Sequence, residues 1–301
     1  MQSSKLQFKI QSFSEKELKK LYIPSSDSHK GQNGKLLLIS GSKLFHSSSL
    51  WALKVASRIV DMVYYSSVDE NNWIVKEAKK EFRDGIITPR NKVENYAQEA
   101  DCILIGPGLP RKEGQEAGDD DTRELTERLL RKYPEKKWVI DGGSLQTIDP
   151  KLIPSTAILT PHPREFELLV SSIKCQVLSI KMRKIKLEEQ VELFAKHCNC
   201  LIVLKGPVDI VCGLDKSMKP PTLKLRRVKG GNAGMTKGGT GDVLAGLTAA
   251  LYCKNNAFLA ASAASYINKK AGESLFAKVG YYFNASDLVD EIPKIMKEIL
   301  I

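Results

Sequence analysis

Long apolar runs are missing from the sequence. No stretch approaches the roughly 18–20 consecutive apolar residues that a transmembrane helix requires, and the first residues, Met1-Gln2-Ser3-Ser4-Lys5, are polar. They also lack the apolar segment and the small-residue cleavage site of a secretory leader. These absences predict a protein of the cytoplasm that has no membrane partner.

Cysteine is scarce and dispersed. Six cysteines are spread over 301 residues, which is unlike the dense pattern of a small disulfide-stabilised domain. The pair Cys198 and Cys200, beside His197, is the only spacing that suggests a metal ion, and no second pair of ligands accompanies it. We therefore expect free thiols and no metal site built from protein side chains.

Two common phosphate-binding motifs are also absent. Gly34-Lys35 is followed by Leu36, so there is no GxxxxGK[ST] loop. Gly239-Thr240-Gly241 lacks a glycine three residues further on, so the dinucleotide fingerprint fails as well. Any nucleotide must bind in another way.

The charge is strongly positive, with 46 lysines and arginines against 35 acidic residues, a net +11. The densest basic groups, residues 181–186 and 226–229, are not interleaved with aromatic residues and belong to no recognisable nucleic-acid module. A solvated basic surface is the simplest interpretation. Such a surface also raises the local concentration of small polyanionic ligands such as phosphates.

Short apolar runs alternate with amphipathic segments and turn residues. The runs are residues 36–39, 102–105, 138–140, 157–159 and 201–204. Uniformly apolar strands are buried on both faces, so we expect an α/β fold with a mostly parallel central sheet covered by helices on both faces. Ligands collect at the carboxyl ends of such strands, where this sequence places Gly, Pro, His, Lys and Asp.

Further elements follow from the same pattern. Helices are expected over 48–63, 243–253, 257–271 and 285–300, the last of them broken or kinked at Pro293. Strands are expected over 208–213 and 222–225, joined by a polar turn. The loop 111–122 carries three consecutive aspartates whose acidity could serve as a helix cap. No repeat or linker interrupts the pattern, which favours one domain.

The most informative segment is the glycine-rich loop before Asp242. Six glycines lie between Gly230 and Gly241. Because no Cβ intervenes, such a loop can bring backbone N–H groups close to an anion. The loop runs directly into an amphipathic helix, whose free N–H groups and positive dipole end favour an anion at the same place.

Asp242 lies in the first turn of that helix, and a helix cap would be a sufficient structural role for it. A cap does not explain the loop, however, because a capped surface helix needs one glycine at most. Helix N–H groups stabilise the ionised carboxylate, which predicts a base competent near pH 7. Its expected task is to take the proton of a substrate hydroxyl that attacks a terminal phosphate.

Several separated motifs occur in an order that is specific to one family. They are His29-Lys30-Gly31-x-x-Gly34, Gly41-Ser42, Gly106-Pro107-Gly108, Asp141-Gly142, Thr160-Pro161-His162-Pro163-x-Glu165, Lys205-Gly206 and residues 232–246. From Ser26 to the last residue, the chain closely resembles the stand-alone ADP/ATP-dependent NAD(P)H-hydrate dehydratases, a branch of the ribokinase-like superfamily. On this resemblance residues 1–25 form an N-terminal extension and residues 26–301 a single ribokinase-like domain.

The resemblance implies a repair reaction. Members transfer a phosphoryl group from ADP or ATP, with Mg²⁺, to the hydroxyl on C6 of hydrated NADH or NADPH, and phosphate then leaves to restore the double bond. It further implies that the protein forms a homo-oligomer, often a tetramer.

The resemblance also assigns roles to residues. Asp242 is the base, and Gly239, Thr240 and Gly241 form the anion hole. The donor nucleotide is held by Lys205, Gly206, Pro207, Val208, Asp209 and Gly241. The hydrated dinucleotide meets Ser48, Gly108, His162 and Asp242. The sequence departs from the usual family pattern at Ser47, Ser48, Arg164 and Asp209.

Two alternatives remain open. A ribokinase-fold kinase of a vitamin-precursor alcohol would share the glycine loop and the aspartate base, but would release a phosphorylated product. A basic nucleic-acid-binding protein would instead show steeply salt-dependent binding that survives Asp242→Asn.

Overall fold

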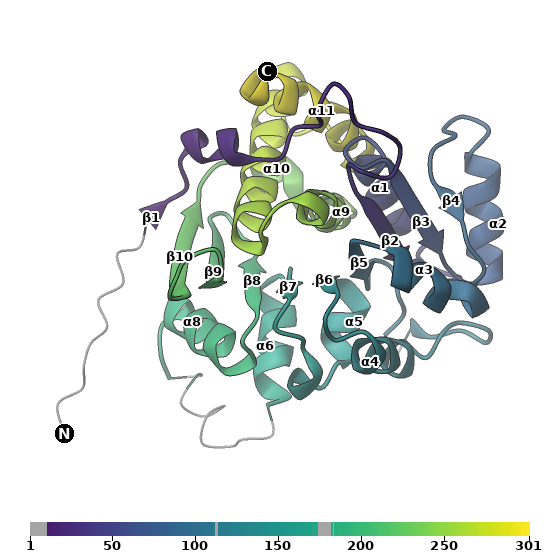
Figure 1. Cartoon of the computed structure of the whole chain (residues 1–301), viewed down its shortest axis with the longest axis horizontal. Coiled ribbons are helices and arrows are strands. Elements are labelled where there is room, and N and C mark those ends of the chain that lie inside the picture. The colour runs from purple at the N-terminus through teal and green to yellow at the C-terminus, as the bar shows by residue number, and fades with distance from the viewer. Residues whose placement is uncertain (1–10, 112–113, 174–181, 183) are drawn as a thin grey trace.

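The chain folds around one mixed sheet with helices on both of its faces (Figure 1). The computed structural model describes residues 11–111, 114–173, 182 and 184–301. Within them ten strands form a sheet of order β1-β10-β9-β8-β7-β6-β5-β2-β3-β4. Every neighbouring pair is parallel except the two that involve β9. The expected α/β architecture with a mostly parallel sheet is confirmed.

The five apolar runs form five consecutive strands of this sheet. The two further strands expected over 208–213 and 222–225 form an antiparallel pair beside them. The strands are β1 (Gln11–Ser12), β2 (Lys35–Ile39), β3 (Met62–Ser66), β4 (Ile86–Ile87), β5 (Cys102–Ile105), β6 (Lys137–Ile140), β7 (Ala157–Leu159), β8 (Leu201–Leu204), β9 (Asp209–Asp215) and β10 (Thr222–Val228).

The helices connect these strands and cover them. The α-helices are α1 (His46–Ala56), α2 (Asp69–Ala78), α3 (Val93–Glu99), α4 (Thr122–Lys132), α5 (Gly142–Thr147), α6 (Pro163–Ser171), α8 (Leu187–Cys198), α9 (Thr240–Lys254), α10 (Ala257–Val279) and α11 (Ala285–Leu300). Short 3₁₀ helices are η1 (Glu15–Lys20), η2 (Arg90–Lys92), η4 (Pro150–Leu152) and η5 (Ala233–Thr236).

Alternate residues of each strand enter two separate cores, because successive side chains in a strand point to opposite faces. Leu36 and Leu38 of β2 pack with α1, α9, α10 and α11. Leu37 and Ile39 pack with α3, α4, α5, α6 and α8 on the other face. Figure 1 shows α9 over the middle of the sheet, on the face that α1, α10 and α11 also cover.

Several helix boundaries differ from those expected, and α1 and α9 begin earlier than expected, at His46 and Thr240. The helix predicted over 48–63 ends at Ala56, and strand β3 begins at Met62. The intervening turn contains no glycine or proline to mark it, and Ile59 and Val63 continue the helical spacing by chance. Helix α10 continues to Val279, and α11 is a continuous helix through Pro293.

The segment before the expected domain boundary is packed on the rest of the chain. Strand β1 pairs with β10, and Leu18 of η1 is fully buried in the core beneath α10 and α11. The Arg226 side chain in β10 is 11% exposed and lies 3.5 Å from the Glu17 carboxylate. The basic group 226–229 is therefore partly engaged in internal pairing.

Some expectations fall outside the described residues. These are the polar start at Met1-Gln2-Ser3-Ser4-Lys5, Cys175, and Lys181 and Arg183 of the basic group 181–186. The other five cysteines are free thiols in the part of the chain that is described. Within that part, every helix is too short or too polar to serve as a membrane span.

Candidate active site

Polar side chains gather where three neighbouring strands end, beneath the first turn of α9. Asp141 follows β6, Thr160 and His162 follow β7, and Lys205 follows β8. These strands are adjacent in the sheet. The expectation that the chemistry lies at the carboxyl edge of the sheet agrees with this placement.

The glycine loop reaches this edge in a conformation that requires glycine. Gly239 is the N-cap of α9 with φ 93°, a left-handed backbone that other residues rarely adopt. A Cβ there would lie 2.3 Å from the ring of Trp51, which packs against the loop. The Thr240 hydroxyl donates to the carbonyl oxygens of Met235 (2.6 Å) and Lys237 (2.9 Å). The loop is thus held by its own side chains, and the backbone of the first turn of α9 faces the strand ends.

Asp242, in the first turn of α9, carries the strongest electrostatic signature of the site. Burial, followed by the negative charge of Asp141, raises the pKa of Asp242 to about 7, against the opposing effects of Lys205 and of a hydrogen bond from Ser48. The sequence predicts that helix N–H groups stabilise the ionised carboxylate and give a base competent near pH 7, whereas burial favours the protonated form. Loss of water around the half-buried carboxyl outweighs the helix terminus, and the group titrates near neutral pH.

Lys205 is held by two buried carboxylates. Its Nζ lies 2.9 Å from Oδ1 of Asp141 and 3.9 Å from Oε2 of Glu165. Burial opposes the charged ammonium, but the carboxylates of Asp141 and Glu165 outweigh it and raise the pKa of Lys205. A Cβ at Gly241 would lie 3.3 Å from Nζ, so the ammonium stands beside the N-terminus of α9.

Asp141 belongs to the same cluster of polar side chains, although its motif carried no expected role. It is 2% exposed, and besides Lys205 it accepts a hydrogen bond of 2.7 Å from the hydroxyl of the fully buried Thr160. The sequence did contain the signal, since Asp141-Gly142 stands at the end of an apolar strand within the ordered motif set. Its partnership with Lys205, 64 positions away, needed the topology.

His162 is the N-cap of α6 and forms a capping box with Glu165. Nδ1 of the histidine accepts from the backbone N–H of Glu165 (3.2 Å), and Oε2 of Glu165 accepts from the backbone N–H of His162 (2.9 Å). The imidazole is 44% exposed, and its Nε2 lies 3.6 Å from Oε1 of Glu165, so Glu165 sets the ring orientation through both nitrogens.

A cavity of about 650 Å³ opens beside Lys205. Its walls include many residues expected to hold the donor nucleotide or the transferred group. These are His162, Lys205, Gly206, Pro207, Asp209, Thr240 and Gly241. Val208, which is 38% exposed, is not among the lining residues. Asn232, the first residue of the motif 232–246, also lines the cavity, as do Asn268 and Lys269, which no sequence motif had indicated.

The Asp209 carboxylate is turned into the protein. It accepts from the backbone N–H of Gly206 (2.9 Å) and the hydroxyl of Ser265 (2.6 Å), and it lies 3.2 Å from Nζ of Lys269. Lys269 in turn donates to the Gly206 carbonyl (2.9 Å). The negative charge that departs from the family pattern is therefore neutralised internally, and it shapes the turn at Gly206 and Pro207.

Of the residues expected to meet the dinucleotide, His162 lines the cavity beside Lys205. Ser48 and Gly108 lie outside it, next to Asp242. Gly108 has φ 67°, and a Cβ there would lie 2.8 Å from the carbonyl oxygen of Phe45 and 2.9 Å from Cβ of Ser48. Ser48, in the first turn of α1, hydrogen-bonds Asp242. The structure thus brings Ser48, Gly108 and Asp242 together on one side, and Lys205 and the nucleotide-sized cavity on the other.

The chain is similar to known proteins in sequence and in fold. The sequence model of the NAD(P)H-hydrate dehydratase family matches residues 36–294. The chain belongs to this family. It is 36% identical over 290 residues, 93% of its length, to the bifunctional NAD(P)H-hydrate repair enzyme Nnr of Methanocaldococcus jannaschii. It spans only 52% of that relative, and about half of several similar ones.

A second relative in this family matches the chain over nearly the whole length of both proteins. The ADP-dependent (S)-NAD(P)H-hydrate dehydratase of Nitrosopumilus maritimus is 30% identical over 296 residues, covering 93% of this chain and 95% of the relative. Among solved structures, a ribokinase-like superfamily protein of Enterococcus faecalis superposes with a TM-score of 0.79 at 20% identity, with 96% of each chain covered. The fold is therefore ribokinase-like.

A third similarity concerns the ADP/ATP-dependent NAD(P)H-hydrate dehydratase of Bacillus subtilis, co-crystallised with ATP/Mg²⁺. Its TM-score is 0.72 at 21% identity, covering 96% of this chain and 99% of the other.

Proposed function

We propose that this chain converts (6S)-NADHX and (6S)-NADPHX to NADH and NADPH at the expense of ADP or ATP. The observation that carries the proposal is the position of Asp242. Its carboxyl, with a pKa of about 7, lies between Lys205 and the nucleotide-sized cavity on one side and Ser48 beside Gly108 on the other. A base so placed can serve an acceptor hydroxyl on one side and a phosphoryl donor on the other.

The proposed reaction has two steps. Asp242 takes the proton of the C6 hydroxyl as its oxygen attacks the terminal phosphorus, and the bond from that phosphorus to the nucleotide breaks, leaving AMP from ADP or ADP from ATP. The first step thus forms a bond from the C6 oxygen to phosphorus. The C6–O bond then breaks, the oxygen leaves as part of phosphate, and a proton leaves the neighbouring carbon, which restores the ring double bond.

The neighbouring residues support transfer by charge and position. We assign Lys205 to the transferred phosphoryl group, because its ammonium lies beside the N-terminus of α9. The backbone N–H groups of Gly239, Thr240 and Gly241 form the anion hole. The donor lies along Gly206, Pro207, Val208 and Asp209. Ser48, Gly108 and His162 contact the hydrated dinucleotide.

Mg²⁺ fits as a nucleotide-borne ion. Among the described residues no group of three or more His, Cys, Asp or Glu side chains could hold a metal, and Asp141 and Glu165 both face Lys205. Mg²⁺ characteristically binds substrate phosphates with few protein ligands, and there it would neutralise phosphate charge.

We further propose that residues 26–301 form a single domain with residues 1–25 as an extension. We also propose that the protein is cytoplasmic and forms a homo-oligomer, with the tetramer that is common in the family as the expected assembly. Light scattering on the purified chain tests the assembly.

The direct test is recovery of absorbance. The protein is incubated with hydrated NADH or NADPH, Mg²⁺ and either ADP or ATP, and restoration of the intact dinucleotide is followed at its absorbance band. We expect recovery that depends on the nucleotide, with a faster rate for ADP because the relative of matching length is named ADP-dependent. Absence of recovery, together with phosphorylation of another alcohol, would support the kinase that family membership disfavours. Binding of DNA that falls steeply with salt and survives Asp242→Asn would support the nucleic-acid alternative.

The pH dependence should follow Asp242. The base works only when it is deprotonated, and its pKa is raised to about 7. We expect kcat/KM to rise about tenfold per pH unit below neutrality and to level off above it. In Asp141→Asn the charge that helps to raise this pKa is gone, so the inflection should move to lower pH. A profile that is flat from pH 5 to 8 would contradict the assignment.

A further inference from the structure

The loop between β2 and α1, residues 40–45, forms a wall of the site on the side of Ser48 and Gly108. The Gly41 N–H donates to the carbonyl oxygen of Pro107 (2.8 Å). The Phe45 carbonyl oxygen lies where a Cβ of Gly108 would be. Because α1 starts directly after this loop, the position of the loop also sets the position of Ser48.

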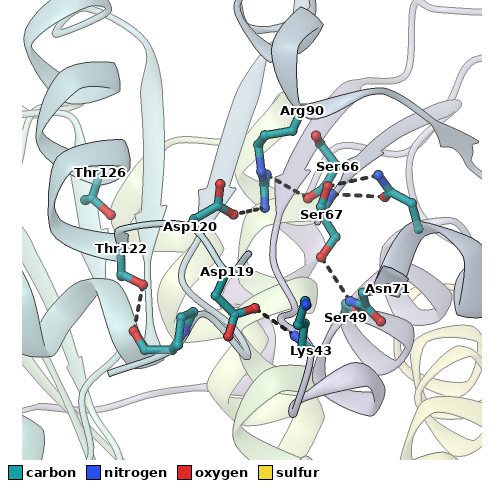
Figure 2. A network of polar contacts seen from close by, with 12 residues as sticks. Lys43, Ser49, Ser66, Ser67, Asn71, Arg90, Asp119, Asp120, Thr122 and Thr126 are labelled. Atoms are coloured by element: carbon teal, nitrogen blue, oxygen red, sulfur yellow. Dashed lines mark hydrogen bonds and ion pairs between the residues drawn. The ribbon is translucent and has the colours of Figure 1, made fainter. Parts of the chain in front are cut away.

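Outside the site, this loop is tied to the segment that precedes α4. Oδ1 of Asp119 accepts a hydrogen bond of 2.9 Å from the backbone N–H of Lys43 (Figure 2). Its Oδ2 accepts one of 3.0 Å from the N–H of Glu116. The Lys43 side chain lies across Gly118, whose added Cβ would be 3.2 Å from Nζ. The half-buried Asp119 carboxylate thus holds a loop residue, Lys43, that lies 76 positions earlier in the sequence.

The three consecutive aspartates have three different partners. Asp121 is the N-cap of α4 and accepts from the N–H of Glu124 at 2.9 Å, as the acidity of the segment had predicted. Asp120 instead pairs with Arg90 at 2.7 Å, and both side chains are 16% exposed. Only Asp119 reaches the loop 40–45, so capping explains one of the three residues.

Arg90 fixes Asp120 against the sheet. Its Nη1 donates to the carbonyl oxygen of Ser66 at the end of β3 (3.0 Å), while Nη2 holds Asp120 (Figure 2). Burial lowers the pKa of Arg90 and the charge of Asp120 raises it, so the guanidinium depends on this partner. The aspartate segment is therefore anchored to a rigid strand end, and Asp119 is anchored with it.

The opposite side of the loop is also fixed. Asn71 of α2 donates to the hydroxyl oxygens of Tyr65 (2.9 Å) and Ser67 (3.0 Å), and its Nδ2 lies where a Cβ of Gly41 would be. The loop is thus held between Asn71 and Asp119.

We propose that Asp119, anchored through the Arg90–Asp120 pair, is a positioning residue that sets the loop 40–45 and thereby the binding of the hydrated dinucleotide. This proposal rests on the proposed function. It acts on one ligand only, because the cavity beside Lys205 is lined by His162 and by residues from 205 onward, and by none from 40–48 or 119. Loss of the Asp119 contact should therefore weaken binding of the hydrated dinucleotide and leave binding of the nucleotide donor unaffected.

The test compares Asp119→Ala with Asp119→Asn. The asparagine retains an oxygen that can accept from the Lys43 N–H, whereas alanine does not. We expect Asp119→Ala to raise the KM for hydrated NADH by about tenfold, the order expected for loss of a hydrogen bond to a charged acceptor. The KM for ADP and kcat should stay within about twofold, and Asp119→Asn should restore most of the dinucleotide KM. Hydrogen exchange at the Lys43 amide should speed up in Asp119→Ala alone.

Asp121→Ala is the matched control in the same segment. It removes the cap of α4, so it should lower the melting temperature without changing either KM. Equal changes of both KM values in Asp119→Ala, no change in either, or the same dinucleotide effect in Asp121→Ala would overturn the positioning role. A wild-type protein that restores no dinucleotide refutes the proposed function and the positioning role with it. An active wild type with unaltered Asp119→Ala kinetics refutes only the latter.

Discussion

Asp242→Asn is expected to fold as the wild type does and to lose about 10²–10⁴-fold in turnover, the usual contribution of a general base. The amide is nearly isosteric with the carboxyl, so the first turn of α9 and its approach to Lys205 should persist. What the amide cannot do is accept the proton of the attacking hydroxyl. Turnover with saturating ADP and hydrated NADH measures the loss, and circular dichroism checks the fold.

The chain offers a matched control in Asp287. It occupies the same position in α11 as Asp242 does in α9, the third residue of the helix, and its carboxylate accepts from the Asn284 N–H at 2.8 Å. If Asp242 only capped its helix, Asp242→Asn and Asp287→Asn would behave alike. We expect Asp287→Asn to lower stability modestly and to leave turnover intact. Retained activity in Asp242→Asn would remove it from its assigned role.

Asp242→Asn should also stabilise the protein at high pH. The pKa of Asp242 is raised from 3.8 to about 7, so folding opposes its ionisation. Its favourable contribution is complete below pH 3.8 and declines as the pH rises towards 7. The loss is at most on the order of 4 kcal/mol, because one pKa unit corresponds to about 1.4 kcal/mol. Melting temperatures of Asp242→Asn and wild type should therefore coincide near pH 4, diverge up to pH 7 and keep a constant gap above it.

The sequence predicts the centre of the sheet well because its strands are buried on both faces. In a chain of this polarity, uniformly apolar runs such as Cys102–Ile105 and Leu201–Leu204 indicate strands at the buried centre of a sheet. Strand β3 was missed for the opposite reason. It follows a turn that lacks breakers, and Ile59 and Val63 imitate a helix that has already ended at Ala56.

The backbone of the site can be predicted from the sequence, whereas the pKa values and ion pairs of its side chains cannot. The glycine loop and the first turn of α9 follow from local sequence, because Gly239 and Asp242 are close neighbours. The pKa of Asp242 depends first on burial that only the assembled fold creates, and then on Asp141 and Lys205, which follow strands β6 and β8. The same holds for Asp209, whose charge is neutralised by Lys269, a residue 60 positions further along the chain.

Lys205→Met should combine a large loss of activity with a large loss of stability. Turnover should fall by about 10²–10³-fold, the usual effect of removing one preorganised donor to a developing negative charge. Stability should fall by about 3–5 kcal/mol, because Asp141 and Glu165 are 2% and 4% exposed and would be left facing each other without a cation. Urea unfolding and turnover at saturating substrates measure the two effects.

The two effects are separable with Asp141→Asn. In the double variant Lys205→Met/Asp141→Asn, one buried charge is gone and the asparagine oxygen can still accept from the Thr160 hydroxyl, which now donates 2.7 Å to Asp141. Stability should recover in large part, since the penalty in the single variant comes from the uncompensated carboxylate. Activity should not recover, because the ammonium beside Gly241 is still missing. Recovery of both would make Lys205 a purely structural cation, placed there to neutralise Asp141, and would leave the α9 terminus alone to bind the transferred phosphoryl group.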